Sequence, residues 1–511
     1  MPVLSENNKR IAQNTMLLYA RMLLTMLASL YISRIVLNVL GVEDFGIFGV
    51  VGGVVTLFSF LNSAMAGSTS RFLTFEIGRD DDEKLKKTFS SALTVHLLIA
   101  GLILVLGETV GWWFLKNKLV IPDGRMYAAI WVYQFSLVSM AISVTQIPYH
   151  ALILAHEKMS VYAYIEMLNV FLKLGMVYLL LVVHADKLIV YAGLVLVISI
   201  IITLIYRLYC YKHYTRCRYR YGWERDVVYP MLSFSGWDLY GNMSTIVRTQ
   251  GVNILLNLFF GPVMNAANMI AVQVQGAVMS FANNIVTATR PQIVKSYAKG
   301  DYQYTCDLVQ NTSKFTCLLL LFLSLPLMVE AKYVLTLWLK NVPEHAVTFC
   351  IYVLIFNFFA TISTVVVGAV HATGNIKRPS LINGSLYVMV LPVSYVAFRF
   401  NAQPEIPYIC NALFVFAGML SNVYTLKLYV PQFRANDFIV NVLCSVLCIS
   451  LIAGVFSLAV RHFMQEGLLR LLSVVFISTL SISISGYFLA MDKYARSLVK
   501  RKVCAFLRQG N

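Results

Sequence analysis

Six polar residues recur at steps of three and four along the apolar segment 231–260. They are Ser235, Asp238, Asn242, Thr245, Thr249 and Asn253. At 3.6 residues per turn they share one side of a helix, with Arg248 about 80° away. Lipid cannot hydrogen-bond to such a face. The pattern predicts a helix that lines water or a substrate, although amides and hydroxyls also join helices to one another.

Two further segments carry polar residues. Tyr162, Glu166, Asn169 and Lys173 form one stripe on 161–183, which predicts either a cavity face or a structural ion pair with another helix. Arg21 and Arg34 each lie six residues from an end of 15–40. Their long side chains either face a cavity or extend to the nearer membrane interface.

The elements that must position these residues are membrane-spanning helices. Apolar residues make up 59% of the chain and charged residues only 13%, against roughly 25% in soluble domains. A span needs about 20 apolar residues. The sequence predicts fourteen, at 15–40, 46–66, 89–114, 127–153, 161–183, 187–209, 231–260, 263–288, 312–336, 346–370, 380–399, 406–428, 436–459 and 470–490.

The distribution of charge predicts the orientation. If the N-terminus is cytoplasmic, 27 of the 41 Lys and Arg residues fall on the inner side and nine on the outer side. This asymmetry is typical of the positive-inside rule and predicts that both termini are cytoplasmic. The net charge of +17 therefore indicates contact with membrane lipids and not with nucleic acid. The first span is expected to be an uncleaved anchor.

A weak internal repeat divides the chain. Val36-Leu-Asn-Val-Leu-Gly41 parallels Leu256-Asn-Leu-Phe-Phe-Gly261, and Ala155-His-Glu-Lys158 parallels Gly374-Asn-Ile-Lys377 at nearly the same offset along the chain. We expect an all-α membrane protein of two parallel six-helix lobes plus a C-terminal hairpin. The expected divisions are an N-terminal lobe at 1–210, a basic linker at 211–228, a second lobe at 229–430, and two extra spans with a basic tail at 431–511.

Signatures of enzymes and metal centres are missing from the sequence. It contains no phosphate-binding GxxxxGK[ST] loop and no zincin, serine-nucleophile or kinase motif, so a primary pump or an enzyme is not expected. The nine cysteines include no CxxC pair and indicate neither a disulfide framework nor a zinc site.

Two segments resemble a known family. Residues 61–78 (LNSAMAGSTSRFLTFEIG) and 287–297 (TATRPQIVKSY) are similar to the ends of spans two and eight in polysaccharide repeat-unit flippases. Asn14-Thr-Met at the start, with Gly41 and Phe45-Gly further on, is similar too. The whole chain resembles the multidrug/oligosaccharidyl-lipid/polysaccharide exporter superfamily.

The resemblance implies two lobes around a central cavity and transport by alternating access. The cargo would be an undecaprenyl-diphosphate-linked oligosaccharide, moved from the cytoplasmic to the outer leaflet of a bacterial inner membrane for capsule, O-antigen or other surface polysaccharide. The implied partners are this lipid-linked oligosaccharide, membrane lipids and other polysaccharide assembly proteins.

The resemblance also implies a cationic cavity, since guanidinium groups bind phosphate oxygens in pairs. The expected substrate-binding residues are Arg21, Arg34, Arg248, Lys173, Asn242, Asn268 and Gln275. Asp238 and Glu166 are candidates for coupling transport to Na⁺ or H⁺. No other cofactor, metal or catalytic residue is expected.

Two other functions stay open. A cation-coupled multidrug and toxin extrusion antiporter would need carboxylates in the lobes, and Asp238 and Glu166 would serve. However, basic residues outnumber acidic ones within the spans, and 15–40 has no Asp or Glu. The other open function is a non-transporting membrane scaffold or a membrane polymerase, although a polymerase would need a large external loop.

Overall fold

The computed structural model is built of helices throughout its described part. It describes residues 2–59, 65–66, 68–70, 72–73, 76–77, 82–156, 158–214, 219, 224–373, 375, 377–490 and 496. Side chains are described for all of these except 2–22, 159, 230, 232–238, 288, 291, 295 and 298. The expected all-α fold is therefore confirmed for this part of the chain.

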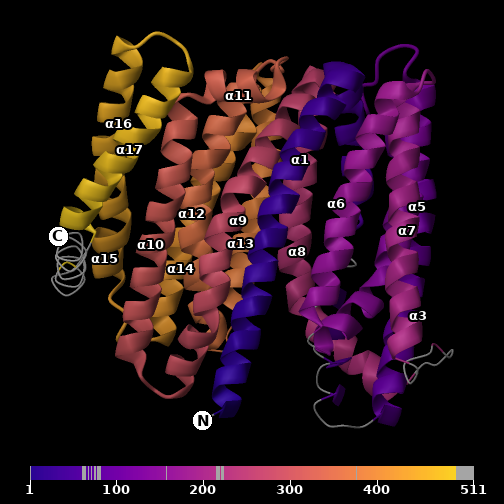
Figure 1. The fold of residues 1–511 in the computed structure, drawn as a ribbon, viewed down its shortest axis with the longest axis horizontal. Helices are drawn as coiled ribbons and strands as arrows, with labels where there is room; N and C mark the ends of the chain where they lie inside the picture. The colour runs from indigo at the N-terminus through magenta and orange to yellow at the C-terminus, as the bar shows by residue number, and fades with distance from the viewer. Residues whose placement is uncertain are drawn as a thin grey trace. The chain divides into compact units, whose positions relative to one another are not determined.

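Most helices are long enough to cross a bilayer (Figure 1). In chain order they are α1 (Pro2–Leu57), α3 (Asp82–Leu106), η1 (Gly107–Gly111), α4 (Trp112–Asn117), α5 (Met126–Ala155), α6 (Met159–Val182), α7 (Lys187–His213), α8 (Arg225–Phe260), α9 (Pro262–Ala298), α10 (Tyr302–Val329), α11 (Ala331–Leu339), α12 (Ala346–Ala372), α13 (Lys377–Arg399), α14 (Ile406–Tyr429), α15 (Ala435–Phe438), η3 (Ile439–Cys444), α16 (Ser445–Phe463) and α17 (Leu468–Leu489).

Twelve segments of the described chain are long and apolar enough to cross a membrane. The expected number was fourteen, and two elements account for the difference. Helix α1 contains the first two expected spans, and Gly41 separates them. Helix α8, at the expected seventh span, is not among the twelve. The structure is consistent with about fourteen helices. Residues 60–64 of the second expected span lie outside the described chain.

Two glycines show that the internal repeat is present in the backbone. Gly41 interrupts α1 with φ 81° and ψ 170°, and Gly261 separates α8 from α9 with φ 79° and ψ −175°. Only glycine adopts this region readily, because a Cβ atom would clash there. The two glycines occupy the same position in the two copies of the sequence repeat. Each one therefore turns the chain between the first two spans of its repeat.

The chain divides into two compact units, which we describe separately. Unit 1 comprises 1–269, 343–346 and 387–407, and unit 2 comprises 270–342, 347–386 and 408–511. These units do not coincide with the expected lobes, whose boundaries stay a prediction.

Each unit has its own apolar core. In unit 1, Ile47, Val51, Val132, Tyr133 and Leu137 belong to one buried cluster. The segment of α1 after Gly41 also packs closely on the start of α9, since a Cβ atom at Gly46 would lie 1.9 Å from the Pro262 carbonyl oxygen. In unit 2, buried residues of α10, α12 and α14 form a second cluster.

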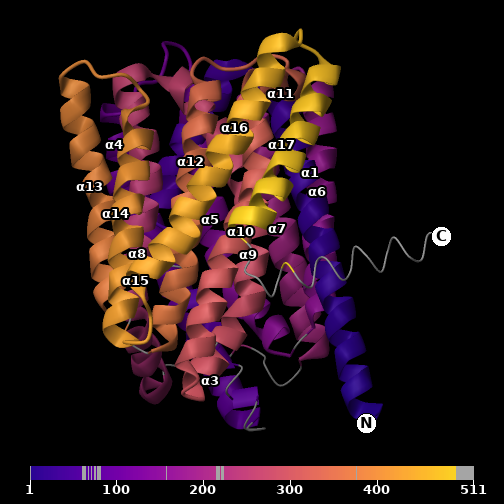
Figure 2. The same cartoon turned by 90° about the vertical axis from the view of Figure 1, so that its left-hand side faces the viewer.

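The C-terminal hairpin α16–α17 lies alongside α10 within unit 2 (Figures 1 and 2). Two arginines attach it at one end: Arg461 donates to the Val329 carbonyl at 2.7 Å, and Arg470 pairs with the buried Glu330 at 2.7 Å. At the other end of α17, Lys314 of α10 donates to the Ala490 carbonyl at 2.9 Å. Because these contacts satisfy groups at both ends of the hairpin, they hold it in a defined position.

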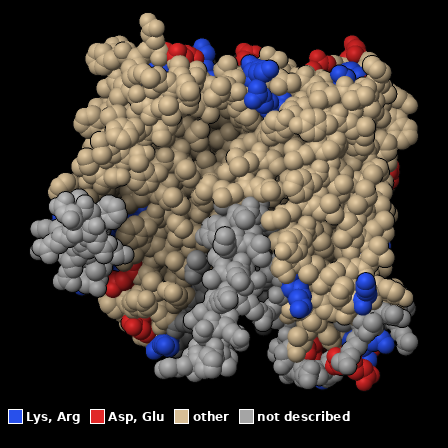
Figure 3. Space-filling view, in the orientation of Figure 1, with Lys and Arg blue, Asp and Glu red and all other residues tan. Residues whose placement is uncertain are grey.

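The surface supports a chain that crosses the membrane many times. On the face in Figure 3, uncharged residues cover most of the described surface. Many large apolar side chains on α16 and α17 are exposed, including Leu451, Val455 and Phe476. Such a surface requires lipid around it.

We expect Gly41→Ala and Gly261→Ala each to destabilise the protein by roughly 1–3 kcal/mol, because a side chain is strained at these backbone angles. The measurement is thermal unfolding of the purified protein in detergent. Gly101→Ala is the matched control, since Gly101 lies inside α3 with open space around it. Equal unfolding temperatures for Gly41→Ala and Gly101→Ala would contradict the conclusion that the backbone angles at Gly41 strain a side chain.

Candidate functional site

The polar face of α8 is accessible over its middle. Thr245 is exposed, and Asn242 and Thr249 are half-buried. The hydroxyls of Thr245 and Thr249 donate to carbonyls one turn earlier in the same helix, at 3.0 and 2.5 Å. Their own donors are thus satisfied, while hydroxyl and amide oxygens remain to accept hydrogen bonds. Lipid cannot supply such partners, so this face is suited to water or a sugar.

Arg248 lies beside this face and is 7% exposed. Its guanidinium carbon lies 4.3 Å from the ring centroid of Tyr387 on α13, which is a cation–π distance. Close packing of α8 on α13 makes the contact possible, since Gly251 lies against the Leu391 side chain. Sequence periodicity placed Arg248 near the polar face but gave no sign of Tyr387, which lies far along the chain on another helix.

Asn257 attaches the loop before α5 to the end of α8. Its side-chain oxygen accepts from the Val120 N–H at 2.9 Å, and its amide donates to the Val120 carbonyl at 3.1 Å. The same amide donates to Asn265 at 3.1 Å. Asn257 is fully buried, so these bonds compensate for the loss of water around it.

Three further amides continue this network across α1, α8 and α9. Asn265 donates to the backbone and side-chain oxygens of Asn253, at 2.6 and 2.8 Å. Asn268 donates to the same side-chain oxygen at 3.0 Å, and Asn253 donates to the Gly49 carbonyl at 3.0 Å. Asn268 was expected to contact substrate, but here it is buried and holds α8 and α9 together. Its binding role stays a prediction.

The stripe on α6 contains no ion pair within the described structure. Glu166 is half-buried and accepts from the Tyr206 hydroxyl at 3.3 Å, while Lys173 is exposed. The His150 ring lies 4.8 Å from that of Tyr162 and 5.9 Å from that of Tyr206. The alternative of a structural ion pair is therefore not seen for Glu166 or Lys173 among the described residues.

The remaining expected residues are dispersed. Arg34 is half-buried, one turn after Tyr31, whose hydroxyl lies 3.0 Å from that of Tyr178 on α6. Gln275 is half-buried in the part of α9 that belongs to unit 2. The side chains of Arg21 and Asp238 lie outside those described. Among the described residues, no group of His, Cys, Asp or Glu is arranged to hold a metal ion.

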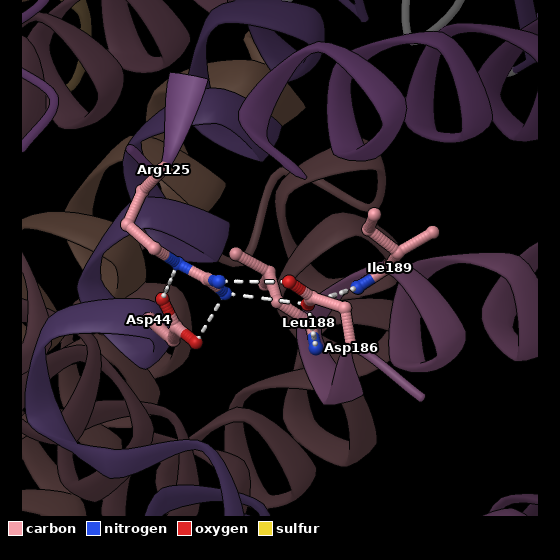
Figure 4. A network of polar contacts seen from close by, with 5 residues as sticks. All are labelled: Asp44, Arg125, Asp186, Leu188 and Ile189. Carbon is pink, nitrogen blue, oxygen red and sulfur yellow. Dashed lines mark hydrogen bonds and ion pairs between the residues drawn. The ribbon is translucent and has the colours of Figure 1, made fainter. Parts of the chain in front are cut away.

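Sequence reasoning missed an ion cluster in unit 1 (Figure 4). Arg125, which precedes α5, donates to both oxygens of Asp44 at 2.8 and 2.5 Å and to those of Asp186 at 2.7 and 3.3 Å. Burial raises the pKa of the Asp186 carboxyl, but hydrogen bonds from Arg125 and from backbone N–H groups of α7 outweigh burial and lower it overall. The ion pair of Arg125 with Asp186 therefore persists through neutral pH.

We expect Asn257→Ala to destabilise the protein by about 1–3 kcal/mol, because it leaves the buried N–H and carbonyl of Val120 without partners. Thermal unfolding in detergent measures the effect. Asn242→Ala removes an amide from the same helix where it is half-buried and should have little effect. If both variants unfolded at the wild-type temperature, Asn257 would not hold this loop.

Comparison with known proteins identifies the family. The profile of the polysaccharide biosynthesis protein family matches residues 11–297, more than half of the chain. No curated protein sequence matches. Among solved structures, a lipid II flippase, MurJ, in an inward closed conformation is similar over 96% of this chain and all of its own, with TM-score 0.68 and 12% identity.

Two transporters of the MOP superfamily share the fold as well. A multidrug resistance transporter of the MATE family, in an inward-facing conformation, is similar over 80% of this chain and 96% of its own, with TM-score 0.66 and 15% identity. A MOP superfamily transporter from Pyrococcus furiosus is similar over 82% of this chain and 96% of its own, with TM-score 0.62 and 14% identity. The chain is a multi-pass membrane protein of the polysaccharide biosynthesis family, with the fold of the MOP exporter and flippase superfamily.

Proposed function

We propose that this protein is a flippase that moves undecaprenyl-diphosphate-linked oligosaccharide from the cytoplasmic to the outer leaflet of a bacterial inner membrane. It would act by alternating access, with both termini cytoplasmic, and supply capsule, O-antigen or another surface polysaccharide. The match to the polysaccharide biosynthesis family supports a cargo that contains a glycan. The fold it shares with a lipid II flippase supports a lipid-linked cargo.

The observation that carries the proposal is that helices of unit 1 carry both basic side chains and accessible hydroxyl groups. Arg34 and Lys173 have no carboxylate partner within the described structure, and Arg248 contacts an aromatic ring. The positive charge of Arg34 and Lys173 suits a diphosphate. The accessible face of α8, with Asn242, Thr245 and Thr249, suits sugar hydroxyls. A cationic drug would be repelled by the same charges.

The membrane potential favours this direction. Outward movement of negative charge from a negative cytoplasm is assisted by about 2.3 kcal/mol per charge per 100 mV. A carrier that returns by binding Na⁺ or H⁺ would add to this drive. Glu166, half-buried and hydrogen-bonded to Tyr206, and Asp238 are the residues we assign to that coupling.

Deleting the protein from its host should cause lipid-linked oligosaccharide to accumulate facing the cytoplasm. We expect Arg248→Ala to reproduce that accumulation at normal membrane levels, and Arg248→Lys to restore part of the transport, since lysine keeps the charge but loses the paired hydrogen bonds. Membrane levels of each variant control for folding. Sensitivity to cationic dyes without accumulation would instead identify a drug exporter.

Neutralising the carboxylates of Glu166 and Asp238 tests whether transport is coupled to Na⁺ or H⁺ through them. We expect Glu166→Gln with Asp238→Asn to slow glycan transport about tenfold or more and to remove its response to ionophores, because neither amide titrates. Oligosaccharide flipping in reconstituted vesicles is the readout. Unchanged transport with an unchanged ionophore response would exclude coupling through these residues.

A further inference from the structure

An arginine that the proposed transport does not use lies within a membrane-spanning helix of unit 1. Arg207 lies on α7, six residues before the end of the helix at His213. Helix α7 is about 40 Å long and the hydrocarbon core of a bilayer about 30 Å thick. Arg207 therefore lies just inside the boundary that the charge asymmetry predicts to be cytoplasmic. A charge at this depth needs a partner and indicates a functional site.

Two neutral residues of α5 hold the guanidinium of Arg207. Its Nη2 donates to the Thr145 hydroxyl at 2.6 Å, and its central carbon lies 5.7 Å from the ring centroid of Tyr149, a cation–π distance. The Thr145 hydroxyl donates its own proton to the Ile142 carbonyl at 2.8 Å, so it only accepts from Arg207. The Phe89 ring packs edge-on against the Tyr149 ring, with centroids 5.3 Å apart. The guanidinium and the ring beside it are therefore positioned by the fold.

The side chain of Arg207 does not extend toward the cytoplasm, as basic side chains near helix ends commonly do. Helices α5 and α7 both run toward the predicted cytoplasmic end. The Thr203 hydroxyl donates to the Gln146 side chain at 3.1 Å, so these two residues lie at one level. Arg207 is one turn nearer the cytoplasm than Thr203, whereas Thr145 is slightly further from it than Gln146. The bond to Thr145 thus turns the guanidinium toward the interior of the membrane.

The guanidinium of Arg207 has more donors than the described structure uses. Of its five N–H groups one bonds to Thr145, and the Nε is buried without an acceptor among the described residues. The half-buried Tyr149 carries a phenolic hydroxyl, which is a further donor. The carboxylate of Glu166 on α6 is bonded to Tyr206. An anion with several oxygens would satisfy these donors, and phosphate is the group that guanidinium binds in this manner.

We propose that Arg207 and Tyr149 bind the phosphate group of a membrane lipid at the predicted cytoplasmic end of unit 1. The guanidinium presents N–H donors in a fork that matches phosphate oxygens, and the tyrosine hydroxyl adds another donor. Two kinds of lipid have this chemistry: the diphosphate-linked cargo and an anionic phospholipid. If the cargo is the occupant, its diphosphate binds here at the start of the outward path, and this part rests on the proposed function.

The second repeat supplies a matched control residue. Lys427 on α14 lies at the same offset from Arg207 as Gly261 does from Gly41. Its side chain is exposed. Lys427→Gln therefore removes one positive charge near the same predicted side of the membrane, at the equivalent position of the repeat, and leaves the proposed site intact.

Lipid binding to the full-length protein in detergent tests the site. Native mass spectrometry measures the affinity for two separate probes, undecaprenyl diphosphate and phosphatidylglycerol. We expect Arg207→Gln to weaken binding of at least one probe about tenfold, the effect of losing a charge-assisted hydrogen bond. Arg207→Lys should weaken it less, because lysine keeps the charge without the fork. Lys427→Gln should leave both affinities at their wild-type values.

The two probes identify the occupant. Weaker binding of undecaprenyl diphosphate alone assigns the site to the cargo, and weaker binding of phosphatidylglycerol alone assigns it to a phospholipid, whether or not the protein moves glycans. Weaker binding of both makes it a site for lipid phosphate in general. Accumulation of lipid-linked oligosaccharide after deletion tests the proposed function separately.

Tyr149→Phe keeps the ring and removes only its hydroxyl, so it tests the site even if Arg207→Gln does not fold. We expect it to weaken binding of the same probe, by less than Arg207→Gln does. Wild-type affinity for both lipids in Arg207→Gln, or in Tyr149→Phe where the first variant does not fold, would overturn the proposal. Equal weakening by Lys427→Gln would overturn it too, since general attraction between charges would then explain the binding.

Discussion

Hydrogen bonding between buried amides is the constraint on which the rest of unit 1 depends. A polar group taken out of water without a partner costs several kcal/mol on alkane transfer scales, so helices that carry asparagine must find partners for it. Asn253, Asn257 and Asn265 find them in one another and in the backbone at Gly49 and Val120. These bonds fix α8 against α1, α9 and the loop before α5.

Fixing α8 decides which of its residues stay accessible. With Asn253 and Asn257 turned into the network, Thr245 is exposed and Asn242 and Thr249 remain half-buried, while Arg248 lies against Tyr387. One helix therefore carries two kinds of polar residue: those that hold neighbouring helices and those, such as Thr245, that stay accessible. The fold alone does not separate an exporter of drugs from a flippase, because both kinds of protein share it. The basic side chains of these helices are the basis on which we propose a phosphate-bearing cargo.

Most of the fold follows from the sequence. Apolar runs predicted the helices, and the constant offset between repeated motifs predicted the equivalence that Gly41 and Gly261 show in their backbone angles. Periodicity also placed Asn253 and Arg248 on or near one face. It did not show that Asn268 packs against Asn253, because a pattern within one helix says nothing of the helix it contacts. Partners such as Val120 and Asn257, distant in the sequence, come together only through tertiary packing. Asp44 and Asp186 likewise reach Arg125 only through tertiary packing.

Cysteine accessibility tests most directly whether the face of α8 lines a path for substrate. Thr245→Cys, Asn265→Cys and Leu204→Cys would each be placed in a chain whose nine native cysteines are replaced, and treated with a membrane-impermeant maleimide. Thr245 is exposed on the polar face, Asn265 is buried, and Leu204 is exposed on the apolar helix α7. We predict rapid labelling at position 245 alone, with protection by lipid-linked oligosaccharide. Labelling at 245 as slow as at 204 would contradict an aqueous substrate path along α8.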